Sequence, residues 1–176
     1  MDRISELKAK SIRLRLVTID DAEFILSLRS DARYNKYLSK VNTDIQSQIE
    51  WILKYKDEEK SKKQFYFIIE RLDGTPCGTV RIYDIKGDSF CWGSWILNQN
   101  KTALSAVESA LLVYKFGFEV LGYRRSHFDV MKGNKKVIDF HKKFGALETG
   151  MDDENIYFEI YPDAVMEMSS KFLNDK

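Results

Sequence analysis

Cysteine, histidine and proline are scarce in this chain of 176 residues, which has two of each. Cys77 and Cys91 lie outside any CxxC spacing, and His127 and His141 do not form a cluster with them. This pattern excludes a disulfide scaffold and supplies no ligand set for zinc, so we expect no bound metal. Because both cysteines lie in strand-like segments, we expect them to be small core residues.

Long hydrophobic runs and a strong net charge are missing as well. No apolar segment is long enough to span a bilayer, and the opening MDRISELKAK lacks the apolar core of a signal peptide. The formal net charge is +1, whereas a nucleic-acid binder needs clustered basic residues that displace counterions. We therefore expect a cytoplasmic protein that contacts neither a membrane nor a nucleic acid.

What the chain does contain is typical of a globular α+β protein, with 44% hydrophobic and 31% charged residues. Its length suits a single domain over residues 1–176, and no repeat or linker divides it. Alternating, β-branched and aromatic patterns predict strands at 12–17, 65–70, 78–85, 89–97, 125–130 and 155–161. The order of elements predicts a mixed, mostly antiparallel twisted sheet with helices on both faces.

Helices are predicted from apolar residues at helical spacing and from their end signals. The expected helices cover 20–29, a segment that follows a Thr43-x-x-Gln46 capping box, 102–121, 135–144, and a short C-terminal segment that begins at 162. Gly122 stands where a left-handed helix end is expected, and the helix over 135–144 is expected to end at Gly145.

The start of the helix that follows strand 89–97 is a natural place for an anion. Unpaired backbone N–H groups and the positive end of the helix dipole meet at a helix start. Lys101, Thr102 and Ser105 cluster at this point. Taken alone, such a cluster is more often only a helix cap.

The order of elements, together with the stretch WILNQNKTALSAVESALLVYKFGFEVLGYRRSHFDVMKGNKKVIDFHKKFGA, resembles the GNAT superfamily of N-acetyltransferases. The similarity is greatest to its branch of ribosomal-protein and nucleotide-sugar enzymes, and it covers nearly the whole chain. It implies an acyl-CoA N-acyltransferase fold, acetyl-CoA as the acyl donor, and a small-molecule primary amine as the acceptor.

The resemblance also implies which residues bind the cofactor. The family's pyrophosphate loop, Q/R-x-x-G-x-G/A, matches Lys101, Thr102, Ala103, Leu104, Ser105 and Ala106. Leu104 stands where the family prefers glycine, and we expect its side chain to share the core-facing stripe of Val107 and Leu111, leaving its amide free for phosphate. The resemblance further implies that backbone amides at Trp95, Ile96 and Leu97 bind pantetheine and the thioester oxygen. Asn134 is expected to contact CoA, to cap a helix, or to do both.

His141 is the candidate acid that protonates the leaving thiolate. It shares a helix face with Val137, Phe140 and Phe144, at the position where many family members carry a tyrosine. Burial would lower its pKa and leave the neutral ring to donate through an N–H, and a satisfied core histidine is the alternative. For the general base the sequence leaves open a water chain or four carboxylates: Asp84, Asp88, Asp129 and Glu108.

By resemblance, the first two helices and their connection form a wall of the acceptor site, with Arg29, Tyr34, Tyr37 and Trp51 as candidates. Trp51 and Tyr55 lie off the apolar stripe of the second helix, where they would hold a nucleotide base or sugar, pack normally, or form a dimer contact.

The phrases GTVRIYDI and WGSWIL look like those of enzymes that act on amino sugars, so a nucleotide-linked amino sugar is the first expectation for the acceptor. A protein N-terminus and a non-catalytic GNAT-like binding module are the alternatives. A homodimer stays open.

Overall fold

A seven-stranded sheet forms the centre of the computed structural model, which describes residues 7–37 and 44–174. The strands lie in the order β1-β2-β3-β4-β5-β7-β6. Neighbouring strands are antiparallel except β4 and β5, which are parallel. The strands are β1 (Ile12–Leu16), β2 (Phe65–Arg71), β3 (Pro76–Lys86), β4 (Ser89–Leu97), β5 (Arg125–Met131), β6 (Leu147–Met151) and β7 (Asn155–Ile160).

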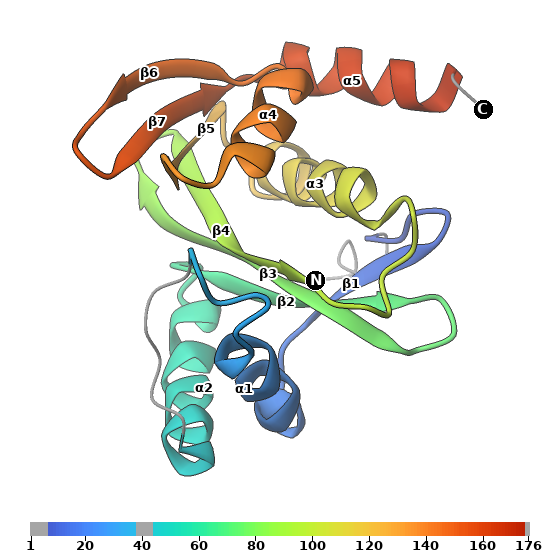
Figure 1. The fold of residues 1–176 in the computed structure, drawn as a ribbon, viewed down its shortest axis with the longest axis vertical. Helices are drawn as coiled ribbons and strands as arrows, with labels where there is room; N and C mark the ends of the chain where they lie inside the picture. Colours follow the sequence, from blue (N-terminus) through green and yellow to red (C-terminus); the bar gives the residue numbers. More distant parts are fainter. Residues whose placement is uncertain (1–6, 38–43, 175–176) are drawn as a thin grey trace.

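Helices cover both faces of this sheet, which confirms the predicted fold class (Figure 1). On one face lie α1 (Ala22–Ser30) and α2 (Ile45–Lys60). On the other face lie α3 (Ser105–Lys115), α4 (Lys135–Phe144) and α5 (Pro162–Asn174). None of the helices in the described ranges is long and apolar enough to cross a membrane.

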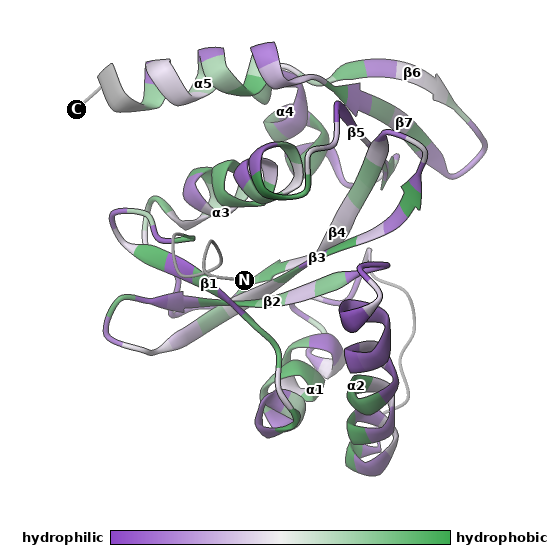
Figure 2. Cartoon of the chain, turned by 180° about the vertical axis from the view of Figure 1, so that it is seen from behind, coloured by the Kyte–Doolittle hydropathy of each residue, from purple (hydrophilic) through white to green (hydrophobic). Residues whose placement is uncertain are grey.

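Two cores meet at β2, because side chains alternate across a strand and both faces are covered. Phe65, Phe67 and Ile69 belong to the larger core, which also includes residues of α3 and α4. Tyr66 and Ile68 belong to the smaller core, with residues of α1 and α2. Figure 2 shows hydrophobic residues along α3 and the strands that it covers, and many hydrophilic residues along α2.

The two cysteines confirm the prediction that they are core residues. Cys77 and Cys91 are free thiols, 0% and 3% exposed, and both lie in the larger core. Burial raises the pKa of Cys91 to about 12, so its thiol stays protonated at neutral pH.

The helix after β4 differs from its prediction in where it starts and in the form of its last turn. It begins at Ser105 and not at Thr102, because the Thr102 amide donates to Ser105 Oγ at 2.8 Å and holds this stretch as a turn. After Lys115 it continues as a π-helical turn over Phe116–Val120. Gly122, with φ of +80°, then ends the segment as predicted.

Two further predictions differ from the structure. The strand β6 was not predicted, because all five of its residues are exposed and its sequence carries no alternation between buried and exposed positions. The N-cap of α2 is Asp44, whose carboxylate accepts from the Gln46 amide at 3.3 Å. The predicted cap, Thr43, lies outside the described residues.

Gly78 lets β3 and β4 approach each other closely. A Cβ at this position would lie 2.1 Å from the carbonyl oxygen of Ile96. Because that atom is backbone, we expect Gly78→Ala to lower the free energy of unfolding by about 3 kcal/mol or more, measured by chemical denaturation. Gly150→Ala is the control, since its Cβ would meet only a Tyr157 ring atom at 4.0 Å. Equal losses in the two variants would contradict the close approach.

Candidate active site

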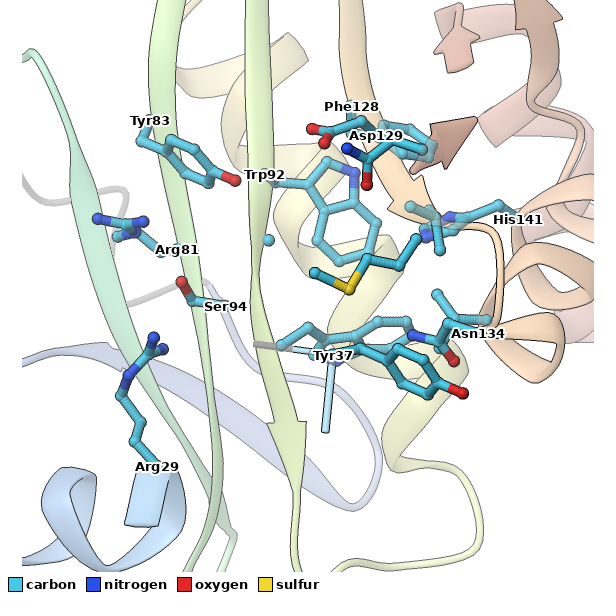
Figure 3. A pocket seen from close by; sticks show the side chains of 16 residues that line it. Arg29, Tyr37, Arg81, Tyr83, Trp92, Ser94, Phe128, Asp129, Asn134 and His141 are labelled. Carbon is cyan, nitrogen blue, oxygen red and sulfur yellow. The ribbon is translucent and has the colours of Figure 1, made fainter. Parts of the chain in front are cut away.

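The strands β4 and β5 separate and leave a cavity between them. They pair only at Ser89 with Arg125 and at Phe90 with Ser126, near their N-terminal ends. Further along, the register of β3 and β4 shifts, and Ser94 adopts a φ of +49°, so β4 is irregular where it diverges from β5. The cavity has a volume of about 290 Å³ and is lined by residues of α1, β3, β4, β5, α4 and β7 (Figure 3).

The structure brings together some of the residues that the sequence singled out. Those that line the cavity are Arg29, Tyr37, Trp95, Asn134 and His141, and Asp129 among the candidate bases. The candidates that are not part of its lining are Tyr34, Trp51, Ile96, Leu97 and the loop Lys101, Thr102, Ala103, Leu104, Ser105 and Ala106.

His141 lies in a cage of aromatic rings and is 5% exposed. The Phe128 ring centroid is 4.3 Å from the imidazole centroid, and the Trp92 ring meets it edge-on at 5.4 Å. Within the described part of the chain, nothing forms a hydrogen bond with the buried Nδ1. Burial lowers the pKa of His141 to about 3, so the ring is neutral at pH 7.

Only one of the four candidate carboxylates, Asp129, lines the cavity. The Glu108 carboxylate is buried and accepts from the amides of Lys10 and Ser11, which ties the segment before β1 to α3. Asp88 forms an ion pair with an arginine of β5, and Asp84 lies close to a lysine and a histidine. Of the four, Asp129 is therefore the one placed to contact a ligand in the cavity.

The turn between β4 and α3 is held by its own side chains. Thr102 Oγ1 lies 2.9 Å from Ser105 Oγ and 2.7 Å from Ser11 Oγ. These hydroxyls thus form hydrogen bonds with one another. The backbone amides of Ala103, Leu104 and Ala106, by contrast, donate to no acceptor in the described residues. Unpaired amides at the start of an 11-residue helix are suited to a diphosphate.

Leu104 occupies the place of the family's glycine without backbone strain. Its φ of −95° and ψ of −4° are open to any L-residue. Its side chain is half-buried but does not pack against the larger core with Val107 and Leu111, so that expectation was wrong. The position therefore needs no glycine for its conformation.

Asn134 and Tyr37 lie at the same edge of the cavity. Asn134 is the N-cap residue of α4, but its side chain makes no capping hydrogen bond. The Tyr37 hydroxyl donates to the carbonyl oxygen of Gly133 at 2.9 Å, which ties the segment after α1 to the turn before α4. Tyr34, by contrast, donates to the Gln99 side chain at 3.0 Å.

For Tyr55, the structure decides among the alternatives left open for the aromatic pair on α2 in favour of ordinary packing. Tyr55 is 1% exposed and its hydroxyl accepts from the Tyr66 amide at 2.8 Å, so it belongs to the smaller core and not to a ligand-binding face. Trp51, which is 37% exposed, stacks on Tyr55 with centroids 5.7 Å apart. Its ring also faces the Arg81 guanidinium, whose carbon lies 5.8 Å from the centroid.

Sequence reasoning missed several residues of the cavity, above all Arg81, Tyr83 and Trp92. In the phrase TVRIYDI, Arg81 and Tyr83 alternate with Val80 and Ile82, which indicates only a polar strand face. That this face borders a cavity depends on the separation of β4 and β5, which has no local signal.

Comparisons with known proteins agree with this geometry. A family model described as an acetyltransferase (GNAT) domain matches residues 11–147. The structure of apo FdhC, a nucleotide-linked sugar GNAT, is 52% identical with a TM-score of 0.88, over 95% of this chain and 96% of that chain. No curated protein sequence matches significantly.

Two more distant structures share the fold at 15% identity and a TM-score of 0.76. One is ribosomal-protein-S5-alanine acetyltransferase from Vibrio fischeri, covering 89% of this chain and 96% of that chain. The other is spermidine N-acetyltransferase from Vibrio cholerae in complex with CoA and spermine, covering 88% and 98%.

Proposed function

This chain belongs to the GNAT acetyltransferase family, and we propose that it transfers an acetyl group from acetyl-CoA to the amine of a nucleotide-linked amino sugar. The observation that carries the proposal is the cavity between β4 and β5, which holds one carboxylate, Asp129, and one buried neutral imidazole, His141. The 52% identity to a nucleotide-linked sugar GNAT supports this class of acceptor.

The residues around the cavity fit acetyl-CoA, which supplies an acyl group activated as a thioester. In this proposal the unpaired amides of Ala103, Leu104 and Ala106 hold the diphosphate at the start of α3. The edge of β4 at 95–97 faces pantetheine. The side chain of Asn134, which makes no capping hydrogen bond, adds a polar contact at the cavity.

The chain's own groups then move the protons of the reaction. Asp129 is exposed, and we propose that it takes a proton from the acceptor's ammonium group and passes it to solvent. His141 is neutral, so it has no imidazolium proton to give to the leaving thiolate, which is the role that the sequence had suggested. In this proposal its N–H donates a hydrogen bond to the departing sulfur, and the thiolate takes its proton from solvent, which balances the proton that Asp129 releases. Direct attack needs no cysteine nucleophile, and both thiols are buried in the core.

Two measurements on the wild-type protein test the proposal. Isothermal titration with acetyl-CoA is expected to show binding, and a free-thiol assay is expected to show CoA release with uridine- or thymidine-diphosphate amino sugars. Absence of heat at millimolar acetyl-CoA would support a non-catalytic module instead. Thiol release with an N-terminal peptide, and with none of the amino sugars, would support a protein N-terminal acetyltransferase.

A further inference from the structure

We propose that Arg81 and Arg29 form an anion-binding subsite that selects acceptors carrying a diphosphate. This inference rests on the proposed function. It assigns a second region of the same cavity, which binds the portion of the acceptor that does not carry the amine. It also names two specificity-determining residues, one of which the sequence did not indicate.

Arg81 carries a charge that no carboxylate of the described residues neutralises. Other arginines, such as Arg15 and Arg125, form ion pairs with aspartate or glutamate, whereas Arg81 forms none. Its Nη1 donates to the neutral side chain of Gln64 at 3.3 Å. A guanidinium group stays charged at neutral pH, so this wall of the cavity is cationic.

The hydrogen bonding of Arg81 is incomplete too. Across the described residues, only two buried side-chain nitrogens or oxygens have no partner, Arg81 Nε and His141 Nδ1. Both residues line the same cavity. A buried N–H without an acceptor costs about 1–3 kcal/mol, so its retention here indicates a constraint other than stability.

Arg29 reaches the same region from α1. Both arginines line the cavity. Burial raises the pKa of the Tyr66 hydroxyl, and the charges of Arg29 and Arg81 act against that rise, which indicates that both guanidinium groups lie near this hydroxyl. Figure 3 shows Arg29 and Arg81 on one side of the site, with His141 and Asn134 on the other. The cavity thus has two cations at one end and the groups of the transfer chemistry at the other.

Aromatic rings fix the orientation of the Arg81 guanidinium. Its central carbon lies 4.2 Å from the Tyr83 centroid and 5.8 Å from the Trp51 centroid. A guanidinium held between rings is preorganised, so it loses little side-chain entropy when it binds an anion. The planar fork of Arg81 matches the oxygens of a diphosphate, and Trp51 offers a half-exposed ring beside it.

The distribution of charge selects against simple polyamines. Among the described residues that line the cavity, Asp129 is the one carboxylate, and it suits one ammonium group, whereas the two arginines repel further cations. The cavity therefore favours an acceptor with one amine and a separate anionic group. A diphosphate-linked amino sugar has both.

The test is a titration of the full chain in the presence of saturating CoA. The CoA occupies the amides at the start of α3, so the probe cannot bind there. Inorganic pyrophosphate and uridine diphosphate are the probes, and malonate represents a carboxylate. We expect both phosphate probes to bind more tightly than malonate, and Arg81→Gln to weaken them about 10- to 100-fold, as for lost charge-assisted hydrogen bonds. Arg124→Gln, which replaces an exposed arginine outside the cavity lining, is the matched control.

Kinetics provide a second readout in the same variants. Arg81→Gln is expected to raise KM for a nucleotide-linked amino sugar by a similar factor, with KM for acetyl-CoA unchanged. Equal loss in Arg124→Gln, a preference for malonate, or unchanged pyrophosphate binding in Arg81→Gln would overturn the inference. Failure of acetyl-CoA to bind the wild-type protein would instead overturn the proposed function, so the two failures are distinguishable. An unchanged melting temperature confirms that Arg81→Gln is folded.

Discussion

Asp129→Asn is expected to lower turnover by about 10²- to 10⁴-fold, the range for loss of a positioned general base. The amide keeps the size of the side chain but cannot take a proton from the acceptor's ammonium group. Within residues 7–37 and 44–174, no carboxylate other than Asp129 lines the cavity, so no other described acid is placed to replace it. Affinity for acetyl-CoA should stay the same. Turnover is measured by thiol release, and affinity by isothermal titration.

Asp84→Asn is the matched control for this experiment. Asp84 is an exposed carboxylate of β3 close to His127 Nε2 at 3.4 Å, and it does not line the cavity. We expect its replacement to leave turnover close to that of the wild-type protein. Near-normal turnover in Asp129→Asn would assign proton removal to a water chain, and would remove Asp129 from the mechanism.

His141→Phe is expected to flatten the dependence of stability on pH. In the unfolded chain the imidazole takes a proton below about pH 6.5, whereas in the folded protein burial lowers its pKa to about 3. Between these values the unfolded state binds more protons, so the free energy of unfolding falls as the pH drops through this window. For this one residue the loss approaches about 5 kcal/mol at pH 3.

Phenylalanine is the appropriate replacement because His141 is surrounded by the rings of Trp92, Trp95, Phe128 and Phe140. Urea denaturation of both proteins at pH 7, 5 and 4 separates this residue from the carboxylates, which titrate in both. Parallel curves would show that the folded imidazole titrates normally. Under the proposed mechanism, turnover of His141→Phe should also fall at unchanged acetyl-CoA affinity, because phenylalanine has no N–H to donate to the leaving sulfur.

Local patterns were reliable where burial leaves a signal in the sequence. The strand β2 and the helix α4 were predicted with nearly their observed bounds, and Gly145 ends α4 with a φ of +110°. The strand β6 was missed because it is exposed along its whole length. The start of α3 was misplaced because Thr102 and Ser105 bond to each other, a contact that a helix-start pattern does not distinguish from a cap.

The candidate site was only partly accessible to sequence reasoning. Resemblance to the family indicated His141 and Asn134, both of which line the cavity, but their roles stay proposals. Among four carboxylates of equal standing, position alone singled out Asp129. The phrase GTVRIYDI indicated a class of acceptor, but nothing in it marked Arg81 as a cavity residue, because a charged residue on the polar face of a strand is the usual case.

The sequence by itself determined the α+β class and the order of the helices and strands apart from β6, because hydrophobic periodicity and end signals are local properties of the chain. The family was indicated by resemblance of the sequence, not by periodicity. Only the tertiary structure decided where β4 leaves β5 and which side chains meet in the gap. That depends on contacts between residues far apart in the chain, from Arg29 on α1 to His141 on α4. Charge balance and burial in the cavity follow from those contacts, and no local pattern encodes them.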